Sequence, residues 1–156
     1  MQFGAPKLWY MKYSLSILIS LIASPVSADC VILLHGLARS SSSFLVMERA
    51  LQGIGYDTVN VDYPSKDGTI PKLTQETLPK AFQKSPAKDK MHFVTHSMGG
   101  ILVRYYLDKM PNLPDNLGHV VMLGPPNKGS AVVDELSDFP GFKLLNGIAG
   151  TQLSYD

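Results

Sequence analysis

The sequence predicts an α/β domain in which helices flank a mostly parallel β-sheet. Three observations support this prediction. Short apolar runs alternate along the chain with longer segments in which apolar residues recur at helical spacing. The first run is continuously apolar, as expected of a strand that is covered on both faces. The chain has 156 residues, of which 45% are hydrophobic, and this is enough for one compact domain with its own core.

Four strands are expected, at residues 31–34, 58–61, 91–95 and 119–123. The first is the apolar run Val-Ile-Leu-Leu, and each of the other three contains the β-branched residue valine. Loops with glycine, proline or serine follow each run, among them Asp-Tyr-Pro-Ser at 62–65 and Gly-Pro-Pro at 124–126. The strands therefore end at turn signals rather than continuing into one another.

Helices are expected between these strands, at residues 44–54, 73–82 and 101–110. The first has apolar residues at helical spacing, serines before it that can serve as N-caps, and glycines at its end. The second is weakly indicated in a polar segment, and Pro111 closes the third. From Ala131 onward the sequence favours one short helix and irregular chain.

Composition excludes several classes of function. The net charge is +1 and only 17% of residues are charged, so nothing indicates a nucleic-acid partner or a polybasic membrane surface. No histidine or cysteine spacing suggests a metal site, and no cofactor is expected. Cys30 is the single cysteine, which excludes an intrachain disulfide. Asp29 before it does not match a lipoprotein signal, where a small residue is required.

Residues 1–28 predict a secretory signal peptide. If translation starts at Met11, a basic residue precedes an apolar run at 13–23, and Pro25 and small residues lead to Ala28. Cleavage after Ala28 would leave Asp29 at the mature end and an exported, periplasmic or secreted protein. Residues 1–10 then read as an extension from a misassigned start. An uncleaved signal anchor is the alternative, although a membrane-spanning helix needs about 20 apolar residues.

The most informative segment is Phe-Val-Thr-His-Ser-Met-Gly-Gly at residues 93–100. A strand runs into Ser97 and a helix follows at once, which is the layout of a nucleophile elbow. Gly99 would let the helix pack close to the strand behind the turn, and Gly100 adds further room. Ser97 is the candidate nucleophile, and the N–H of Met98, at the helix start, is a candidate donor to an oxyanion. The alternative is a plain turn serine before a helix.

A second oxyanion donor is expected in the loop after the first strand. His35-Gly36-Leu37 directly follows that strand, so the N–H of Leu37 is the candidate. Gly36 allows the turn, and His35 is expected to be structural and to orient the loop. Asp62 ends a strand at the same edge of the sheet, but it precedes the serine in the chain.

The segments LLHGLARS, VTHSMGG and GPPNKGS together resemble the α/β-hydrolase superfamily, and specifically its bacterial lipases and esterases, over about residues 31–130. The resemblance implies that residues 29–156 form the N-terminal part of an α/β-hydrolase fold. It implies Ser97 as nucleophile, an acyl-enzyme, and Leu37 and Met98 as the backbone oxyanion hole. The implied partner is a small-molecule or lipid ester. Thr95 replaces the first glycine of the elbow, where a small side chain is expected to be tolerated.

The resemblance also implies an acid and a histidine after the serine, beyond further strands. His119 opens the next strand, and Asp134, Glu135 and Asp138 come soon afterwards, so none has the right topology. We therefore expect the base and the acid to lie outside this sequence. The truncated chain should then be a weak or inactive catalyst, because the oxyanion hole and substrate binding alone accelerate the reaction only about 10³-fold over water. Two alternatives remain open: a non-catalytic remnant or binding module of this fold, and acyl transfer or amide or thioester cleavage.

Overall fold

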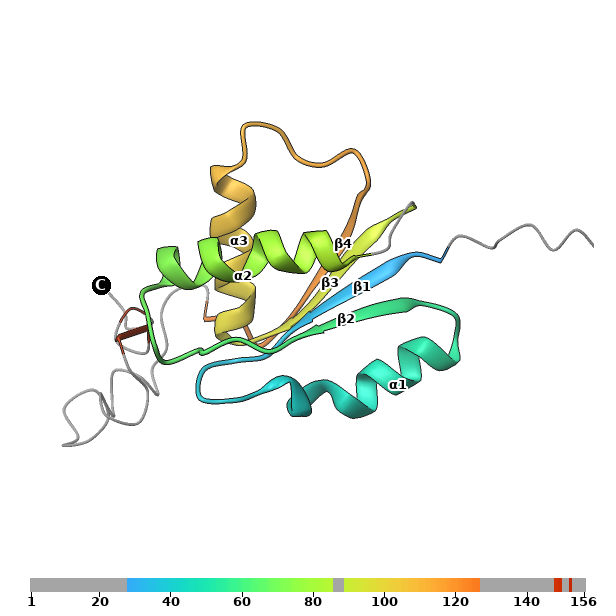
Figure 1. Cartoon of the computed structure of the whole chain (residues 1–156), viewed down its shortest axis with the longest axis horizontal. Helices are drawn as coiled ribbons and strands as arrows, with labels where there is room; N and C mark the ends of the chain where they lie inside the picture. Colours follow the sequence, from blue (N-terminus) through green and yellow to red (C-terminus); the bar gives the residue numbers. More distant parts are fainter. Residues whose placement is uncertain (1–27, 86–88, 127–147, 150–151, 153–156) are drawn as a thin grey trace, which may run out of the picture.

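The computed structural model describes residues 28–85, 89–126, 148, 149 and 152 (Figure 1). Strands and helices alternate along these residues, as the sequence predicts. In chain order they are β1 (Cys30–Leu34), the 3-10 turn η1 (Ser41–Phe44), α1 (Leu45–Gly53), β2 (Asp57–Val61), α2 (Ile70–Lys84), β3 (Met91–His96), α3 (Met98–Lys109) and β4 (Leu117–Leu123). The signal peptide predicted at 1–28 lies outside the described residues except for Ala28, and so does the chain after residue 126 except for residues 148, 149 and 152.

The four strands form one sheet in the order β2-β1-β3-β4, and every neighbouring pair is parallel. Helix α1 lies on one face of the sheet and α2 and α3 lie on the other (Figure 1). The predicted fold class is therefore confirmed. The chain moves from β1 outward to β2 and then returns to the other side of β1 for β3. This reversal places the loops after β1 and β3 side by side at the carboxyl edge, where open α/β sheets bind their ligands.

The core has two parts, one on each face of the sheet. The larger cluster joins the sheet to α2 and α3, and its fully buried members include Ile32, Phe93 and Leu102. The smaller cluster, built on Val31, Leu33 and Phe44, packs between the sheet and α1. The central strand β1 is buried along its whole length, including Cys30, and burial raises the pKa of the Cys30 thiol.

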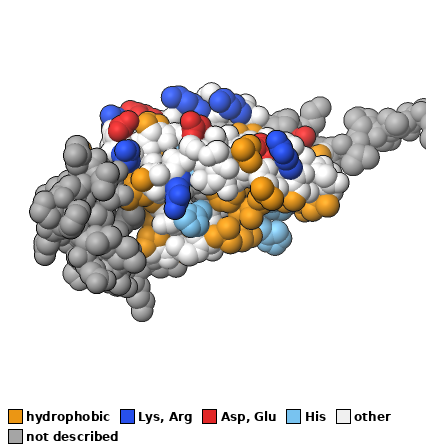
Figure 2. Space-filling model, turned by 90° about the horizontal axis from the view of Figure 1, so that it is seen from below, with side chains coloured by type: hydrophobic (Ala, Val, Ile, Leu, Met, Phe, Trp, Pro, Cys, Tyr) orange, Lys and Arg blue, Asp and Glu red, His pale blue; other side chains and the backbone are white. Residues whose placement is uncertain are grey.

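The face that carries α1 is only partly covered. Figure 2 views this face from below and shows hydrophobic side chains gathered on it. On β4, Met122 lies near Gly100 of α3, so the alternate residues Val121 and Leu123 point to the α1 side. Their exposed fractions are 48% and 38%. Helix α1 therefore protects β1 and β2 more completely than it protects β4.

Helix α2 is longer than the sequence predicts, beginning at Ile70 instead of residue 73. The N-cap Thr69 accepts a hydrogen bond from the N–H of Lys72 at 3.4 Å, and the side chain of Gln152 accepts one from the N–H of Ile70 at 2.7 Å. One face of the helix, including Leu78, is buried against the core. Tertiary burial and a remote capping contact thus extend a helix whose local sequence is weak.

Asp29 ties the start of β1 to its neighbours. Its carboxylate accepts hydrogen bonds from the N–H of Lys90 at 2.9 Å and from Nε2 of His92 at 3.2 Å. His92 Nδ1 in turn accepts from the N–H of His119 at 2.9 Å, so His92 links the first half of β3 to that of β4. The Lys90 N–H, and then His92, lower the pKa of Asp29. No helix in the described ranges is long and apolar enough to cross a bilayer.

The depressed pKa of Asp29 predicts a pH-dependent contribution to stability. Because the folded-state pKa lies below the ordinary aspartate value of 3.8, the contribution is present above that value and is lost as the pH falls through the folded-state pKa. Asp29→Asn should therefore lower the free energy of unfolding at pH 7, and the deficit should shrink at acidic pH. Urea denaturation at several pH values measures this. Asp67→Asn, in an exposed loop, is the control; an equal deficit at every pH would contradict the prediction.

The close packing at Gly99 predicts that one added methyl group lowers the stability of the fold. A β-carbon at this position would lie 2.6 Å from the Leu34 carbonyl oxygen and 2.8 Å from that of His35, and backbone atoms cannot move aside cheaply. Gly99→Ala should lower the free energy of unfolding by about 1–3 kcal/mol. Gly53→Ala is the matched control, since a β-carbon there meets nothing within 4 Å and helix propensity favours alanine by up to about 1 kcal/mol. Equal urea midpoints for the two variants would refute the prediction.

Candidate active site

Ser97 occupies a strained turn between β3 and α3. Its backbone angles are φ 50° and ψ −120°, a conformation that residues other than glycine rarely adopt. The surrounding backbone holds the turn: the Ser97 N–H donates to the Leu123 carbonyl at 2.9 Å, and the Gly100 N–H donates to the Ser97 carbonyl at 3.0 Å. The hydroxyl does not cap α3. The strand–serine–helix geometry predicted from the sequence is therefore present.

Two glycines let α3 approach the sheet directly after the serine. Gly99 packs against the carbonyl groups at the end of β1, so the close approach expected behind the turn involves the neighbouring strand. Gly100 faces β3, where a β-carbon would lie 3.1 Å from Thr95 Oγ1. Thr95 is fully buried, and its hydroxyl has no hydrogen-bond partner among the described residues. A threonine thus fits at the position of the elbow's first glycine.

The loop after β1 lies directly against this turn. A β-carbon at Gly36 would be 2.8 Å from His96 Nδ1 and 3.2 Å from the β-carbon of Ser97. A side chain at position 36 would therefore press on the candidate nucleophile. The structure brings together the two segments that sequence analysis selected, although they are separated by about 60 positions in the chain.

The two candidate oxyanion donors, Leu37 and Met98, both have backbone N–H groups without an acceptor within the described part of the chain. Met98 is the first residue of α3, a 12-residue helix, so its N–H is one of the unpaired groups at a helix start. The Met98 side chain is fully buried and that of Leu37 packs against the core. Only their backbone groups are thus left for a ligand.

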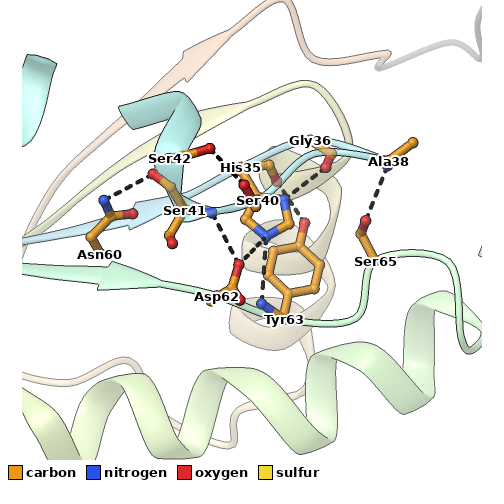
Figure 3. A network of polar contacts seen from close by, with 10 residues as sticks. All are labelled: His35, Gly36, Ala38, Ser40, Ser41, Ser42, Asn60, Asp62, Tyr63 and Ser65. Carbon is orange, nitrogen blue, oxygen red and sulfur yellow. Dashed lines mark hydrogen bonds and ion pairs between the residues drawn. The ribbon is translucent and has the colours of Figure 1, made fainter. Parts of the chain in front are cut away.

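His35 is a fully buried part of this loop (Figure 3). Its Nδ1 lies 2.8 Å from the Gly36 carbonyl oxygen, and the Tyr63 N–H donates to its Nε2 at 3.4 Å. A neutral ring with the proton on Nδ1 satisfies both contacts. Burial lowers the pKa of His35 and favours this neutral form, although the Gly36 carbonyl and Asp62 act in the opposite direction. These contacts agree with the structural role expected for His35.

Tyr63 and Ser65, in the loop after β2, hold the loop after β1 from the other side. The Tyr63 hydroxyl donates to the His35 carbonyl at 2.6 Å, and the two rings stack with centroids 4.2 Å apart. The Ser65 hydroxyl accepts from the Ala38 N–H at 3.0 Å (Figure 3). Neither residue has a role that the sequence predicts. No local pattern could have identified them, because their partners lie 27 or 28 positions away.

None of the described acids or histidines completes a catalytic triad with Ser97. Asp62 accepts from the Ser41 N–H at 3.0 Å and lies 3.6 Å from His35 Nε2, and β1 separates its strand from β3. His119 stacks on His92 four positions before the carboxyl end of β4, about 13 Å at the usual strand rise. Within the described ranges, no hydrogen bond to the Ser97 hydroxyl and no metal-binding group of three or more side chains is found.

The hydrogen bond from the Tyr63 hydroxyl should contribute measurably to the stability of the fold. Tyr63→Phe keeps the ring stacked on His35 but leaves the buried His35 carbonyl without its donor, which should cost about 1–3 kcal/mol of unfolding free energy. Tyr56→Phe is the matched control, since Tyr56 is half-buried with an edge-on ring contact to His92. Urea denaturation compares the two. A Tyr63→Phe variant as stable as the control would show that the bond contributes nothing.

Comparison with known proteins agrees with this geometry. The family model described as alpha/beta hydrolase fold matches residues 29–153. No curated protein matches the chain. Among solved structures, the mature Bacillus licheniformis lipase BlEst2 is 24% identical with a TM-score of 0.64, and the match covers 83% of this chain and 56% of the lipase. Phospholipase PlaB from Legionella pneumophila is 22% identical with a TM-score of 0.61, over 82% of this chain and 33% of that protein.

An extracellular alpha/beta-hydrolase from a Paenibacillus species is also similar, at 20% identity and a TM-score of 0.53, over 75% of this chain and 48% of that one. The chain thus spans about half or less of the length of these three proteins. At such identities the likeness shows the fold alone. Together with the parallel sheet and the strained turn at Ser97, the family match over residues 29–153 shows that the chain belongs to the α/β-hydrolase fold family.

Proposed function

We propose that this protein is a serine hydrolase that cleaves carboxylic esters through an acyl-enzyme formed on Ser97. The observation that carries the proposal is the conformation of Ser97 itself. A positive φ of 50° at a non-glycine residue costs free energy, and such strain persists where the surrounding structure imposes it, commonly at functional sites. The hydroxyl of this strained residue makes no capping hydrogen bond to α3, the helix that follows it.

In the proposed reaction, Ser97 Oγ attacks the ester carbonyl carbon while a base takes the hydroxyl proton. The carbonyl oxygen becomes an oxyanion that accepts hydrogen bonds from the N–H groups of Leu37 and Met98. Collapse expels the alcohol, which takes up a proton, and water then releases the acid from Ser97. Each N–H donor in such a site lowers the activation free energy by about 3–4 kcal/mol. We assign the base and its acid to residues outside the described ranges.

The proposed substrate is a lipid or a small-molecule ester. The lipase and the phospholipase to which the chain is similar support this class, although at an identity that shows fold alone. We also propose that the protein is exported after cleavage behind Ala28, as the sequence of residues 1–28 predicts. The extracellular α/β-hydrolase among the similar structures supports export.

A fluorophosphonate probe tests the proposed nucleophile directly, because it reacts with an activated serine. The chain, expressed with any residues that follow Asp156 in its reading frame, should be labelled, and Ser97→Ala should not be. Ser43→Ala, an exposed serine of η1, should label like the unaltered protein. Absence of labelling in all forms would favour a binding module, and labelling of Ser97→Ala would place the nucleophile elsewhere. Product analysis with matched ester, amide and thioester substrates separates ester hydrolysis from related acyl chemistry.

A further inference from the structure

We propose that Ser65, from the loop after β2, is a positioning residue for the oxyanion site: it binds the Ala38 N–H and so leaves the Leu37 N–H as the free donor. The inference rests on the proposed function, because it concerns the loop that would hold the oxyanion. It adds a residue that touches neither the nucleophile nor any reacting atom. The direction of the Leu37 N–H depends on how the two peptide groups that flank Leu37 are held.

The peptide group before Leu37 is fixed by His35. A peptide unit is planar and trans, so the Gly36 carbonyl and the Leu37 N–H belong to one rigid plane and point in opposite directions. His35 Nδ1 donates to that carbonyl at 2.8 Å. The Leu37 N–H is thereby turned away from the His35 ring. It has no acceptor among the described residues.

The peptide group after Leu37 is fixed by Ser65. The Ala38 N–H donates to Ser65 Oγ at 3.0 Å, and Ser65 is itself 4% exposed. The Ser65 N–H donates to the Tyr63 carbonyl at 2.8 Å, so the hydroxyl is presented from an ordered turn. With both flanking planes fixed, the backbone angles of Leu37 are determined, and so is the direction of its N–H.

Ala38 shows why the second contact is needed. Its φ is 54°, and it is one of two non-glycine residues with positive φ among those described, the other being Ser97. Alanine disfavours this conformation, so an external contact must hold it. If Ser65 released the Ala38 N–H, relaxation of φ would rotate the peptide between Leu37 and Ala38. Ala38 is otherwise exposed, and among the described residues Ser65 is the one that holds its N–H.

The test compares Ser65→Ala with Ser65→Thr, which keeps a hydroxyl, and with Ser43→Ala as the matched control. The rate of probe labelling at Ser97 should fall about 10- to 100-fold in Ser65→Ala, the range expected when a catalytic donor is misplaced by about 1 Å. With an ester substrate, kcat should fall while KM stays near that of the unaltered protein. Ser65→Thr should recover most of the rate, and Ser43→Ala should lose none.

A second variant separates positioning from general stability. Glycine adopts positive φ without strain, so Ala38→Gly placed in the Ser65→Ala protein should restore part of the labelling rate. Both proteins are labelled under conditions in which urea denaturation shows them to be folded, so a recovered rate reports the loop and not the global stability. Absence of any recovery, or a Ser65→Ala protein that labels at the unaltered rate, would overturn the proposal.

Amide hydrogen exchange gives a readout that does not depend on activity. The Ala38 amide should be protected in the unaltered protein and lose that protection in Ser65→Ala, whereas protection in the central strand β1 should persist. If the unaltered protein is never labelled but Ala38 behaves in this way, the proposed function fails and the positioning of the loop stands. If Ala38 exchanges equally in both proteins, the positioning role fails whatever the labelling shows.

Discussion

The close packing of α3 against the end of β1 is the constraint on which the candidate site depends. Gly99 brings the helix start so near to the Leu34 and His35 carbonyl groups that no β-carbon fits between them. The chain must therefore turn sharply between β3 and α3, and Ser97 is the residue that takes the unfavourable backbone angles. The backbone strain at Ser97 and the close packing at Gly99 both follow from the short distance between α3 and the end of β1.

The same approach of β1 and α3 defines the surroundings of the serine. It brings Gly36 within reach of His96 and Ser97, so the loop after β1 lies directly against the turn that leads into α3. The loop after β2 then holds the loop after β1 through Tyr63 and Ser65. Donors that are fixed before a substrate arrives need no reorganisation when negative charge develops, and this is how preorganised sites stabilise an oxyanion.

The sheet places the site at the reversal of its strand order. Because β2 and β3 lie on opposite sides of β1, the loops after β1 and β3 meet with no other strand between them. Asp62 follows β2 and is separated from the serine by β1, so it contacts His35 and Ser41 instead. The topology thus explains why Ser97 lies beside the loop after β1, while Asp62, directly after β2, contacts other residues of the loops.

The sequence by itself determined the fold class, the order of the strands and helices, and the candidate nucleophile, because these depend on local patterns. Apolar runs, helical spacing and the glycines after Ser97 are all readable within a short window. The start of α2 was missed although its N-cap Thr69 is a local signal, and the second contact there, from Gln152 to the Ile70 N–H, comes from more than 80 positions away. Only the tertiary structure decided that Gly99 packs on β1 and that Tyr63 and Ser65 hold the loop after β1. Such contacts join residues distant in sequence, and a single hydrogen bond between two loops leaves no periodic signal along the chain.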